Sequence, residues 1–398
     1  MKKSLLFICS FLAMNFANAQ WSQKSSMFGF GRFSGVGFAI NGKAYVGLGQ
    51  IYDESYVYDF REYNPVSDTW TKKADYPGRG SYAASAFVIN GKGYVCLGAD
   101  NSVNCQYDMW EYSPESDTWL QKPGFPGIER YGASCFVIGD TAFLGTGSYG
   151  NGKSYLSDMW MYVGSTNSWT RIADFPGDSR SHATAFTIGK YGFMGTGIRD
   201  NVTATGDMWK YDRSSDTWER IPEFPGLAGW KLCNFVINEK AYVGTGSDLN
   251  NAFNRFFEYD PVKNSWSAVM NIPVDLQVRL GAVGFSIGNV GYLATGFSNY
   301  DLLTDLWAFD PNASYASPGI PGRNRSNLYP NPVKQILNLE TTGKGIKLTI
   351  STTEGEELLS RNIVNTLTQV DLSGLAKGVY VAKLTSERTV EVKKIVKE

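Results

Sequence analysis

A tryptophan recurs along most of this chain at an almost constant interval, and this repeat constrains the fold more than any other feature. Successive members of the series are 48 to 50 residues apart: Trp21, Trp70, Trp119, Trp169, Trp218 and Trp266. A second series keeps the same period: Phe38, Phe87, Phe136, Phe186, Phe235 and Phe285. Six copies with a period of about 49 residues are typical of a protein built from repeated supersecondary units.

Within one repeat the residues alternate as they do in β-strands. In the second copy, residues 81–89 (SYAASAFVI) predict a first strand, Asn90-Gly91 a two-residue hairpin turn, and residues 92–98 (KGYVCLG) a second strand. Asp108-Met109-Trp110 opens a third strand, and a further turn leads into a fourth strand that contains Trp119. Four antiparallel strands per repeat predict one blade of a β-propeller, so six copies predict six blades.

The repeat count also predicts how the ring closes. The sixth repeat has its first three strands between Leu280 and Phe309, and no tryptophan strand follows Asp310-Pro311-Asn312. Trp21, in contrast, precedes the first strand of the first repeat and belongs to no complete repeat of its own. We expect the Trp21 segment to complete the last blade, which would join the two ends of the propeller and remove its open sheet edges.

These residues resemble the kelch family, whose repeat ends its second strand in a glycine pair, has a Tyr-Asp-Pro-like step after its third strand and a tryptophan in its fourth. Glu258-Tyr259-Asp260-Pro261 with Trp266 matches this pattern closely, and the resemblance covers about residues 21–312. The glycine pair is usually spaced by one residue, as in Gly145-Thr146-Gly147, and Cys96 and Ala294 replace its first glycine in two copies. The fold that the resemblance implies is all-β, a six-bladed kelch-type propeller over residues 20–312.

The composition changes after the last repeat. Residues 313–325 contain prolines and glycines without periodicity and indicate a linker, and short alternating stretches in residues 326–398 predict a small Ig-like β-sandwich. Three motifs resemble the type A C-terminal sorting domain of the type IX secretion system of Bacteroidetes: Tyr329-Pro330-Asn331-Pro332, Gly378-Val379-Tyr380-Val381 and Lys393-Lys394-Ile395-Val396-Lys397. The resemblance implies that this machinery is a partner of residues 326–398, and that the domain is removed after passage through the outer membrane. An adhesive Ig-like module is the alternative.

The N-terminus predicts an export signal. Lys2 and Lys3 precede an apolar run from Leu5 to Phe16, and Ala17-Asn18-Ala19 supplies the small residues that a signal peptidase reads. We therefore expect residues 1–19 to be a signal peptide. An uncleaved anchor is the alternative, but the run is shorter than the roughly 20 residues that a membrane span needs. No later segment is apolar enough to span, so we expect no membrane span in the mature chain and a secreted or cell-surface location.

Charge and histidine content argue against several function classes. The 37 Lys and Arg residues nearly balance the 38 Asp and Glu residues, so the chain has no net positive field that would attract nucleic acid. The single histidine, His182, cannot supply a multi-histidine metal site. Copper oxidases resembling galactose oxidase need two histidines and a cysteine-linked tyrosine, so that activity is rejected. We expect no metal, no cofactor and no nucleic-acid partner.

The cysteines do not form the pattern of a disulfide-stabilised scaffold. Cys9 lies in the predicted signal peptide, and Cys135 and Cys233 lie in separate repeats, where we expect small buried side chains. Cys96 and Cys105 flank one short loop and could pair across neighbouring strands. Export permits this disulfide without requiring it.

The loops on one face of the propeller are the predicted binding surface, because the turns on the other face are short. Six residues before the Phe of the second series, four repeats have an arginine, and aromatic residues follow in several repeats. The candidate ligand-binding residues are Arg32, Tyr82, Arg130, Tyr131, Arg180, His182, Trp230 and Arg279. We expect them to ring the mouth of the central channel and to bind a carboxylate-bearing or polyhydroxylated ligand, since guanidinium groups bind oxyanions and aromatic faces stack on sugars.

Alternatives remain at each of these positions. The arginines could instead hydrogen-bond loop carbonyls of neighbouring blades, with Glu129 and Asp178 neutralising Arg130 and Arg180, and His182 could be a channel-lining residue with a hydrogen-bond partner. No convergent catalytic set is evident, so we expect a binding protein for a glycan or a protein rather than an enzyme. The alternatives are a sugar isomerase similar to exported six-bladed sialic acid mutarotases, with Glu129 or Asp178 as acid or base, and a purely structural surface protein.

Overall fold

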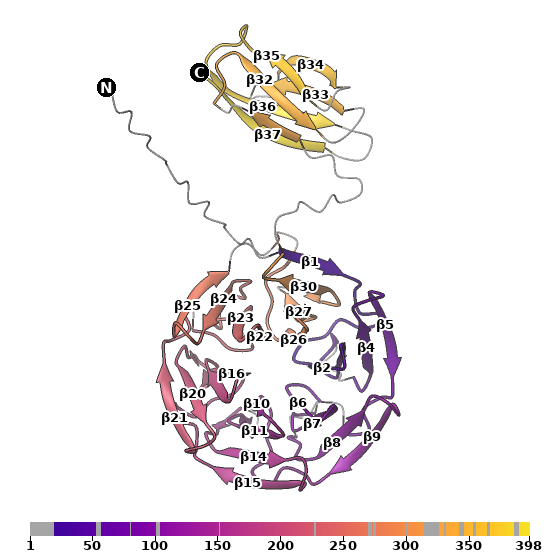
Figure 1. Ribbon diagram of the computed structural model, residues 1–398, viewed down its shortest axis with the longest axis vertical. Helices are drawn as coiled ribbons and strands as arrows, with labels where there is room; N and C mark the ends of the chain where they lie inside the picture. Colours follow the sequence, from indigo (N-terminus) through magenta and orange to yellow (C-terminus); the bar gives the residue numbers. More distant parts are fainter. Residues whose placement is uncertain are drawn as a thin grey trace, which may run out of the picture. The chain divides into compact units, whose positions relative to one another are not determined.

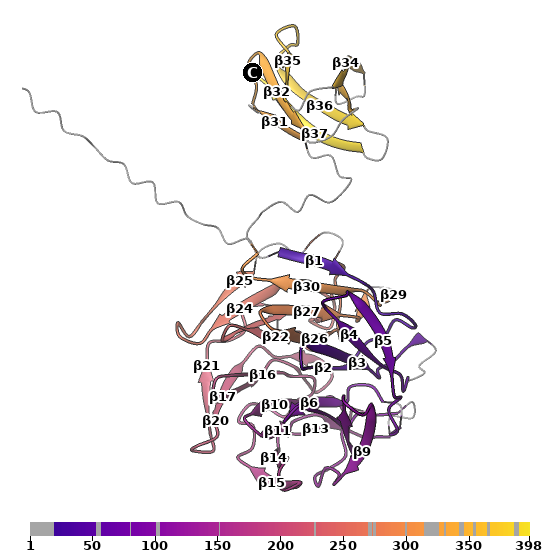
Figure 2. The same ribbon diagram turned by 45° about the vertical axis from the view of Figure 1, so that its right-hand side comes forward.

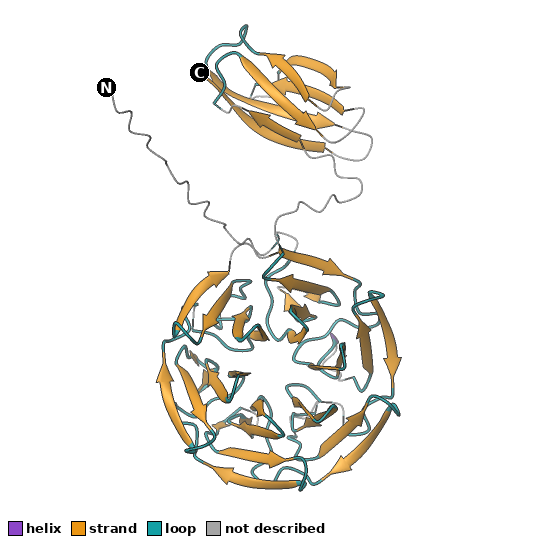
Figure 3. Cartoon of the chain, in the orientation of Figure 1, coloured by secondary structure: helices purple, strands orange, loops and turns teal. Residues whose placement is uncertain are grey.

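The computed structural model describes residues 20–52, 57–79, 81–100, 104–150, 152–226, 228–269, 273, 276–298, 301–313, 326–329, 332–341, 346–352, 356–363, 367–385 and 390–398. The predicted signal peptide and all but residue 313 of the predicted linker lie outside these residues and stay predictions, and so do Pro330 and Asn331 of the first sorting motif. Two compact units separate between Ser314 and Tyr315. Strands make up almost all of the regular structure in both units (Figure 3). Among the described residues, no helix has both the length and the hydrophobicity needed to span a lipid bilayer.

The described strands of the first unit form six four-stranded antiparallel sheets, which stand as blades around a central axis (Figure 1). Blade 1 contains β2 (Val36–Ile40), β3 (Lys43–Gly47), β4 (Phe60–Asn64) and β5 (Thr69–Lys73). Blade 2 contains β6 (Ser85–Ile89), β7 (Lys92–Cys96), β8 (Met109–Ser113) and β9 (Thr118–Lys122). Blades 3 and 4 contain β10 (Ser134–Ile138), β11 (Thr141–Gly145), β14 (Met159–Val163), β15 (Ser168–Ile172), and β16 (Thr184–Ile188), β17 (Tyr191–Gly195), β20 (Met208–Asp212), β21 (Thr217–Ile221).

Blades 5 and 6 contain β22 (Cys233–Ile237), β23 (Lys240–Gly244), β24 (Phe256–Asp260), β25 (Ser265–Val269), and β26 (Val283–Ile287), β27 (Val290–Ala294), β30 (Leu306–Asp310), β1 (Gln20–Lys24). Among the described residues, three short hairpins extend the loops between second and third strands: β12 (Ser148–Tyr149) with β13 (Ser154–Tyr155), β18 (Ile198–Arg199) with β19 (Thr203–Ala204), and β28 (Phe297–Ser298) with β29 (Asp301–Leu302). The predicted all-β, six-bladed propeller is confirmed.

Strand β1 closes the ring by completing the last blade. It lies beside β30 (Figure 2) and pairs antiparallel with it over its whole length, with Trp21 opposite Phe309 in the register. The Trp21 ring lies 5.0 Å from Phe309 and 5.0 Å from Phe256 of blade 5, measured between centroids. The closure predicted from the count of tryptophans is therefore confirmed, and the outer edge of β30 is covered by the opposite end of the chain.

The two periodic aromatic series pack the blades against one another. Phe136 stacks on Phe143 of its own blade, with centroids 5.1 Å apart and planes 8° from parallel. A Cβ at Gly192 of the next blade would meet the Phe136 ring at 2.0 Å, so only glycine permits this approach. The tryptophans bind the preceding blade instead, as when Trp119 Nε1 donates to the carbonyl of Ala74 at 3.0 Å. The period of about 49 residues is therefore the length of one blade, because each blade repeats the residues that pack against its two neighbours.

The first strand of each blade is shorter than the sequence predicts. Strand β6 begins at Ser85 rather than Ser81, because Ala83 has a φ of +52° and interrupts the extended backbone. Tyr82 still forms an isolated bridge with Ala99 beyond the strand end. This interruption recurs in every blade and shapes the channel mouth.

The second unit is a two-sheet β-sandwich. One sheet has the order β31 (Ser326–Tyr329), β32 (Ile336–Thr341), β35 (Leu367–Asp371), and the other has β34 (Glu357–Ile363), β33 (Ile346–Ser351), β36 (Gly378–Thr385), β37 (Val390–Lys397). Leu337 and Leu339 of the first sheet pack with Leu348, Ala382 and Ile395 of the second in one buried core. Residues that alternate along each strand therefore form this core, as the sequence predicts.

Candidate functional site

One residue of each blade contributes to a closed ring of backbone hydrogen bonds at the long-loop end of the channel. We call these residues the mouth ring: Ser34, Ala83, Gly132, His182, Lys231 and Gly281. Each N–H donates to the carbonyl of the ring residue in the preceding blade, over 2.7–3.4 Å. All six have a φ between +51° and +62°, which non-glycine residues rarely adopt. The hydrogen-bond ring holds them in this conformation.

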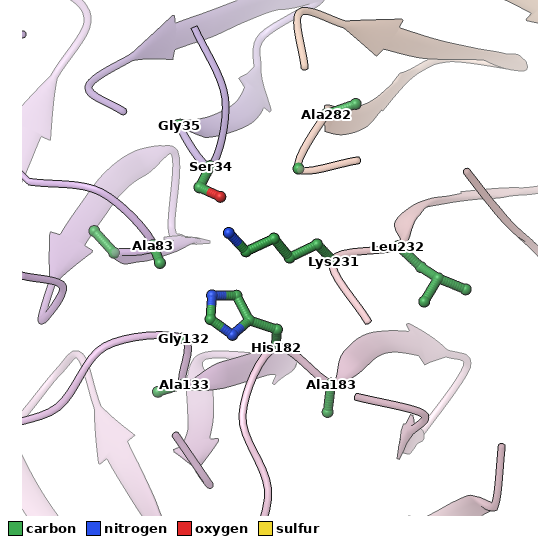
Figure 4. A pocket seen from close by; sticks show the side chains of 12 residues that line it. Ser34, Gly35, Ala83, Gly132, Ala133, His182, Ala183, Lys231, Leu232 and Ala282 are labelled. Carbon is green, nitrogen blue, oxygen red and sulfur yellow. The ribbon is translucent and has the colours of Figure 1, made fainter. Parts of the chain in front are cut away.

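The mouth ring surrounds a cavity of about 140 Å³. Four of its members have side chains no larger than that of serine, so His182 and Lys231 dominate the cavity. Figure 4 shows the Lys231 side chain crossing the channel toward Ser34, with the His182 imidazole beside it. A second cavity of about 250 Å³ shares residues such as Ala84 and Ala183 with the first and continues along the channel.

Aromatic rings, not carboxylates, surround Lys231. Its Nζ lies 4.7 Å from the ring centroids of Phe33 and Trp230 and 5.9 Å from that of Tyr82. Burial lowers the pKa of the Lys231 amine to about 7, and no neighbouring charge contributes to this shift. The cation–π contacts offset only part of the desolvation. The channel mouth therefore holds an amine whose protonated form no described carboxylate neutralises.

His182 is the second titratable group of the mouth ring. Its Nδ1 lies 3.1 Å from Ser181 Oγ, within hydrogen-bond distance. The imidazole packs edge-on against Tyr131 and Trp230, with centroids 6.0 and 5.3 Å away. Burial, and after it the charge of Lys231, lowers the pKa of His182 well below its usual value. The imidazole is therefore neutral near pH 7.

Several buried polar atoms at the mouth have no hydrogen-bond partner among the described residues. They are Ser34 Oγ, His182 Nε2 and Trp230 Nε1. Buried polar groups are normally satisfied, and an unsatisfied one costs about 1–3 kcal/mol. Together with Lys231, these atoms form a set of polar groups whose partners the described part of the chain does not supply.

The four predicted arginines do not line this cavity. Each is at most 1% exposed and binds an aspartate that precedes the third strand of its own blade: Arg32 with Asp59, Arg130 with Asp158, Arg180 with Asp207 and Arg279 with Asp305. Each also donates to a carbonyl just after the second strand of that blade, those of Leu48, Thr146, Thr196 and Thr295. The expectation that these side chains ring the mouth is not met, because the aspartates draw them into the blade.

The carboxylates assigned to the arginines from the sequence also lie elsewhere. Glu129 and Asp178 are exposed, and Asp178 pairs with Arg199. Asp207 neutralises Arg180 instead. Burial alone would raise the pKa of the Asp207 carboxyl, but the hydrogen bonds and charge of Arg180 outweigh it and lower that pKa below its usual value.

The other predicted site residues do come together at the mouth. Tyr82 and Tyr131 have ring centroids 5.4 Å apart, and His182 and Trp230 continue the row of rings around the channel. We call Phe33, Tyr82, Tyr131 and Trp230 the aromatic wall. The sequence prediction omitted Phe33, Ser34 and Lys231, although the alignment of the repeats places Ser34 and Lys231 in the column of His182, two residues after the arginine position.

Comparison with protein families decides the identity of both units. A family model described as the KLHDC2/KLHL20/DRC7 Kelch-repeats domain matches residues 38–229, and one described as the Secretion system C-terminal sorting domain matches residues 327–398. This chain is a kelch-repeat protein with a C-terminal sorting domain. Both resemblances inferred from the sequence are confirmed.

Solved structures also share the fold of the kelch propeller. One, titled "Structure of YjhT", is 15% identical, covers 71% of this chain and 95% of its own, and superposes with a TM-score of 0.61. At that identity the likeness shows the fold alone. No curated protein matches the chain.

The sorting domain indicates the location of the protein. A domain of this kind passes its protein to the type IX secretion machinery, so the kelch-repeat protein is secreted or attached to the cell surface.

Among the described cysteines of the propeller, none forms a disulfide, and Cys96 is buried in a core with Met109 and Leu144. No group of three or more His, Cys, Asp or Glu side chains within the described ranges is placed to hold a metal ion.

Replacing Lys231 with methionine is expected to stabilise the kelch propeller. The pKa of Lys231 is lower in the folded chain than in the unfolded one. Burying the protonated amine therefore lowers the free energy of unfolding by its full amount below pH 7, and this destabilisation disappears as the pH rises from 7 through the pKa of the unfolded chain. We expect Lys231→Met to raise the free energy of unfolding by about 2 kcal/mol at pH 6, after discounting for solvent at the mouth, and by much less near pH 10.

Thermal unfolding across this pH range measures the effect. Lys263→Met is the matched control, because Lys263 lies in an exposed turn beside Asp260. A loss of stability in Lys231→Met at pH 6 would contradict the uncompensated burial of the amine.

Proposed function

We propose that this kelch-repeat protein is a binding protein that acts outside the cell and takes an acidic glycan at the mouth ring. The observation that carries the proposal is Lys231, a cation without a described carboxylate partner that lies between aromatic rings at the opening of a cavity. A carboxylate on the ligand would supply the missing counter-charge in a desolvated site, where such a pair is stronger than in water.

The aromatic wall supports a sugar as the body of this ligand. Tyr82, Tyr131 and Trp230 present partly exposed ring surfaces next to polar groups, an arrangement that suits the apolar faces and hydroxyl edges of a sugar. Ser34 Oγ and Trp230 Nε1 would donate hydrogen bonds to ligand oxygens. A carboxylated sugar unit combines both requirements.

The sugar isomerase alternative loses the residues on which it depended. Glu129 and Asp178 were its acid or base, and neither is among the residues that line the mouth cavity. A protein ligand on the same loops is a further alternative. It would not require a carboxylated sugar, so the glycan array below would then show no preference for acidic glycans.

A glycan array probed with the full-length protein tests the proposal. We expect binding to glycans that end in a carboxylated sugar and at least about tenfold weaker binding to neutral ones, the equivalent of one desolvated charge pair. Lys231→Met should abolish this preference, and Lys263→Met should keep it. Equal binding of acidic and neutral glycans, or no binding to either, would overturn the assignment and favour a protein ligand or a structural role.

A further inference from the structure

Lys231 differs in its surroundings from the lysines on the blades. Lys43 and Lys240, for example, each place Nζ 2.6 Å from a glutamate. Lys231 has aromatic rings on several sides, and none of the described residues gives its Nζ an ion pair. Such surroundings favour the neutral amine, which keeps an electron pair free for nucleophilic attack.

The amine is also placed where a small molecule can reach it. The Lys231 side chain is half-buried and extends into the mouth cavity of about 140 Å³ (Figure 4). Ala83 lies across the mouth ring from Lys231, and neither it nor Gly132 and Gly281 fills the cavity with a large side chain. This space suits a compound of a few carbon atoms, or one end of a larger molecule that extends past the aromatic wall.

We propose that Lys231 captures small aldehydes, including the open-chain end of a reducing sugar, as an imine at the channel mouth. The lone pair of Nζ attacks the carbonyl carbon, a C–N bond forms, and the carbonyl oxygen takes up a proton to give a carbinolamine. Loss of that hydroxyl with a proton from nitrogen releases water and leaves a C=N bond. Amine and aldehyde become imine and water, so the step needs no oxidant or reductant.

His182 and Ser34 are placed to assist these proton transfers. The neutral imidazole lies beside the Lys231 amine, and its Nε2 has no partner among the described residues (Figure 4). It can accept the proton that nitrogen loses and return it to the departing hydroxyl. Ser34 Oγ, which is likewise without a described partner, can donate to the oxygen of the carbinolamine.

The ionisation of the amine supports this chemistry. With the pKa of Lys231 lowered to about 7, roughly half of the amine is neutral at pH 7, whereas an ordinary lysine is neutral in fewer than about one molecule in a thousand. Desolvation alone causes the shift, and the nearest other titratable group of the ring, His182, is neutral. The arginines two residues before the ring positions are paired with aspartates.

The inference goes beyond glycan binding, because it requires only the amine and the cavity. A glycan array without hits would leave aldehyde capture intact, and unreactive Lys231 would leave glycan binding intact. The two proposals therefore fail separately. Where both hold, the charge of a bound carboxylate favours the protonated amine, which takes its proton from water, and so slows the reaction with aldehydes.

Reductive trapping of the full-length protein tests the inference. The protein is incubated with glyceraldehyde and cyanoborohydride, which reduces an imine to a stable secondary amine, and peptide mass spectrometry follows the adduct at each lysine. We expect Lys231 at pH 7 to react at least about tenfold faster than the exposed Lys72 and Lys263, which are controls within the same sample. The comparison needs no substitution, so misfolding of a variant cannot obscure it.

The pH profile and one variant complete the test. The rate at Lys231 should level off above pH 7 to 8, whereas the rates at Lys72 and Lys263 should keep rising. Lys231→Arg should lose the fast adduct while the two exposed lysines react as before. Labelling of Lys231 no faster than of the exposed lysines, or a rate that rises in parallel with theirs, would overturn the proposal.

Discussion

Replacing Arg180 with methionine is expected to lower the free energy of unfolding of the propeller by about 3–5 kcal/mol, because it leaves a partly buried carboxylate without its counter-charge. The Arg180 guanidinium donates to both carboxylate oxygens of Asp207, at 2.6 and 3.0 Å, and to the carbonyl of Thr196 at 2.9 Å. It also stacks on Phe175, 4.9 Å from the ring centroid. The substitution therefore disconnects the first, second and third strands of blade 4 where they meet.

A surface pair that begins in β15 of the neighbouring blade 3 is the matched control. Arg171 and Asp174 also form a salt bridge, but both are about half exposed, so Arg171→Met should change the stability by no more than about 0.5 kcal/mol. Thermal unfolding of both variants measures the contrast, with a shift on the order of 10 °C expected for Arg180→Met. Equal midpoints for the two variants would mean that the buried pair does not hold the blade together.

The pH dependence separates charge pairing from lost packing. The pKa of Asp207 is lower in the folded chain than in the unfolded chain, so its pairing stabilises the fold above the unfolded value of about 3.9 and is lost as the pH falls below it. The difference between the wild type and Arg180→Met should therefore narrow between pH 7 and pH 3. A constant difference would indicate packing alone.

Deleting the closing strand is expected to destabilise the propeller even more, on the order of 5 kcal/mol or more. A variant that lacks residues 20–24 loses the Trp21 contacts with Phe256 and Phe309 and all of the pairing between β1 and β30. It also leaves the edge of β30 open, and open sheet edges promote association. Thermal unfolding and size-exclusion chromatography measure the two consequences.

Trp266→Ala is the control for the closing strand. Trp266 occupies the equivalent position in blade 5, where β25 follows β24 through a continuous chain. This variant should lose packing energy but stay monomeric. If the deletion variant is also monomeric and melts no lower than Trp266→Ala, then β1 contributes no more than one tryptophan side chain and the ring does not depend on closure.

The blades could be predicted from the sequence because their periodic residues meet the same requirement in each copy. A phenylalanine such as Phe136 must pack on the strand beside it and on the glycine of the next blade, so its spacing repeats with the blade. The same count showed that Trp21 belongs to no complete repeat of its own, and this predicted that its strand completes the last blade. Strand ends were less predictable: Ala83 interrupts the first strand of blade 2 with a positive φ that its residue type does not announce.

The candidate site was only partly predictable for a related reason. Tyr82, Tyr131, His182 and Trp230 were predicted at the channel mouth and lie there. The arginines were predicted beside them but lie within the blades, because the aspartate that binds each one is 26 to 28 residues further along the chain. Nothing in the local sequence shows that these two residues meet.

The sequence by itself determined the number of blades, their order, the closing strand and the export domain, since each depends on patterns that repeat or that stand together along the chain. Three adjacent positions precede the first strand of each blade: the arginine position, the aromatic position and the mouth-ring position. Only the tertiary structure decided which of them directs its side chain into the channel. The six backbone hydrogen bonds of the mouth ring hold a left-handed backbone conformation that directs Lys231 and His182 into the cavity, while Arg180, two residues before His182, turns to Asp207. Those bonds join all six blades, so they exist only once the ring has closed.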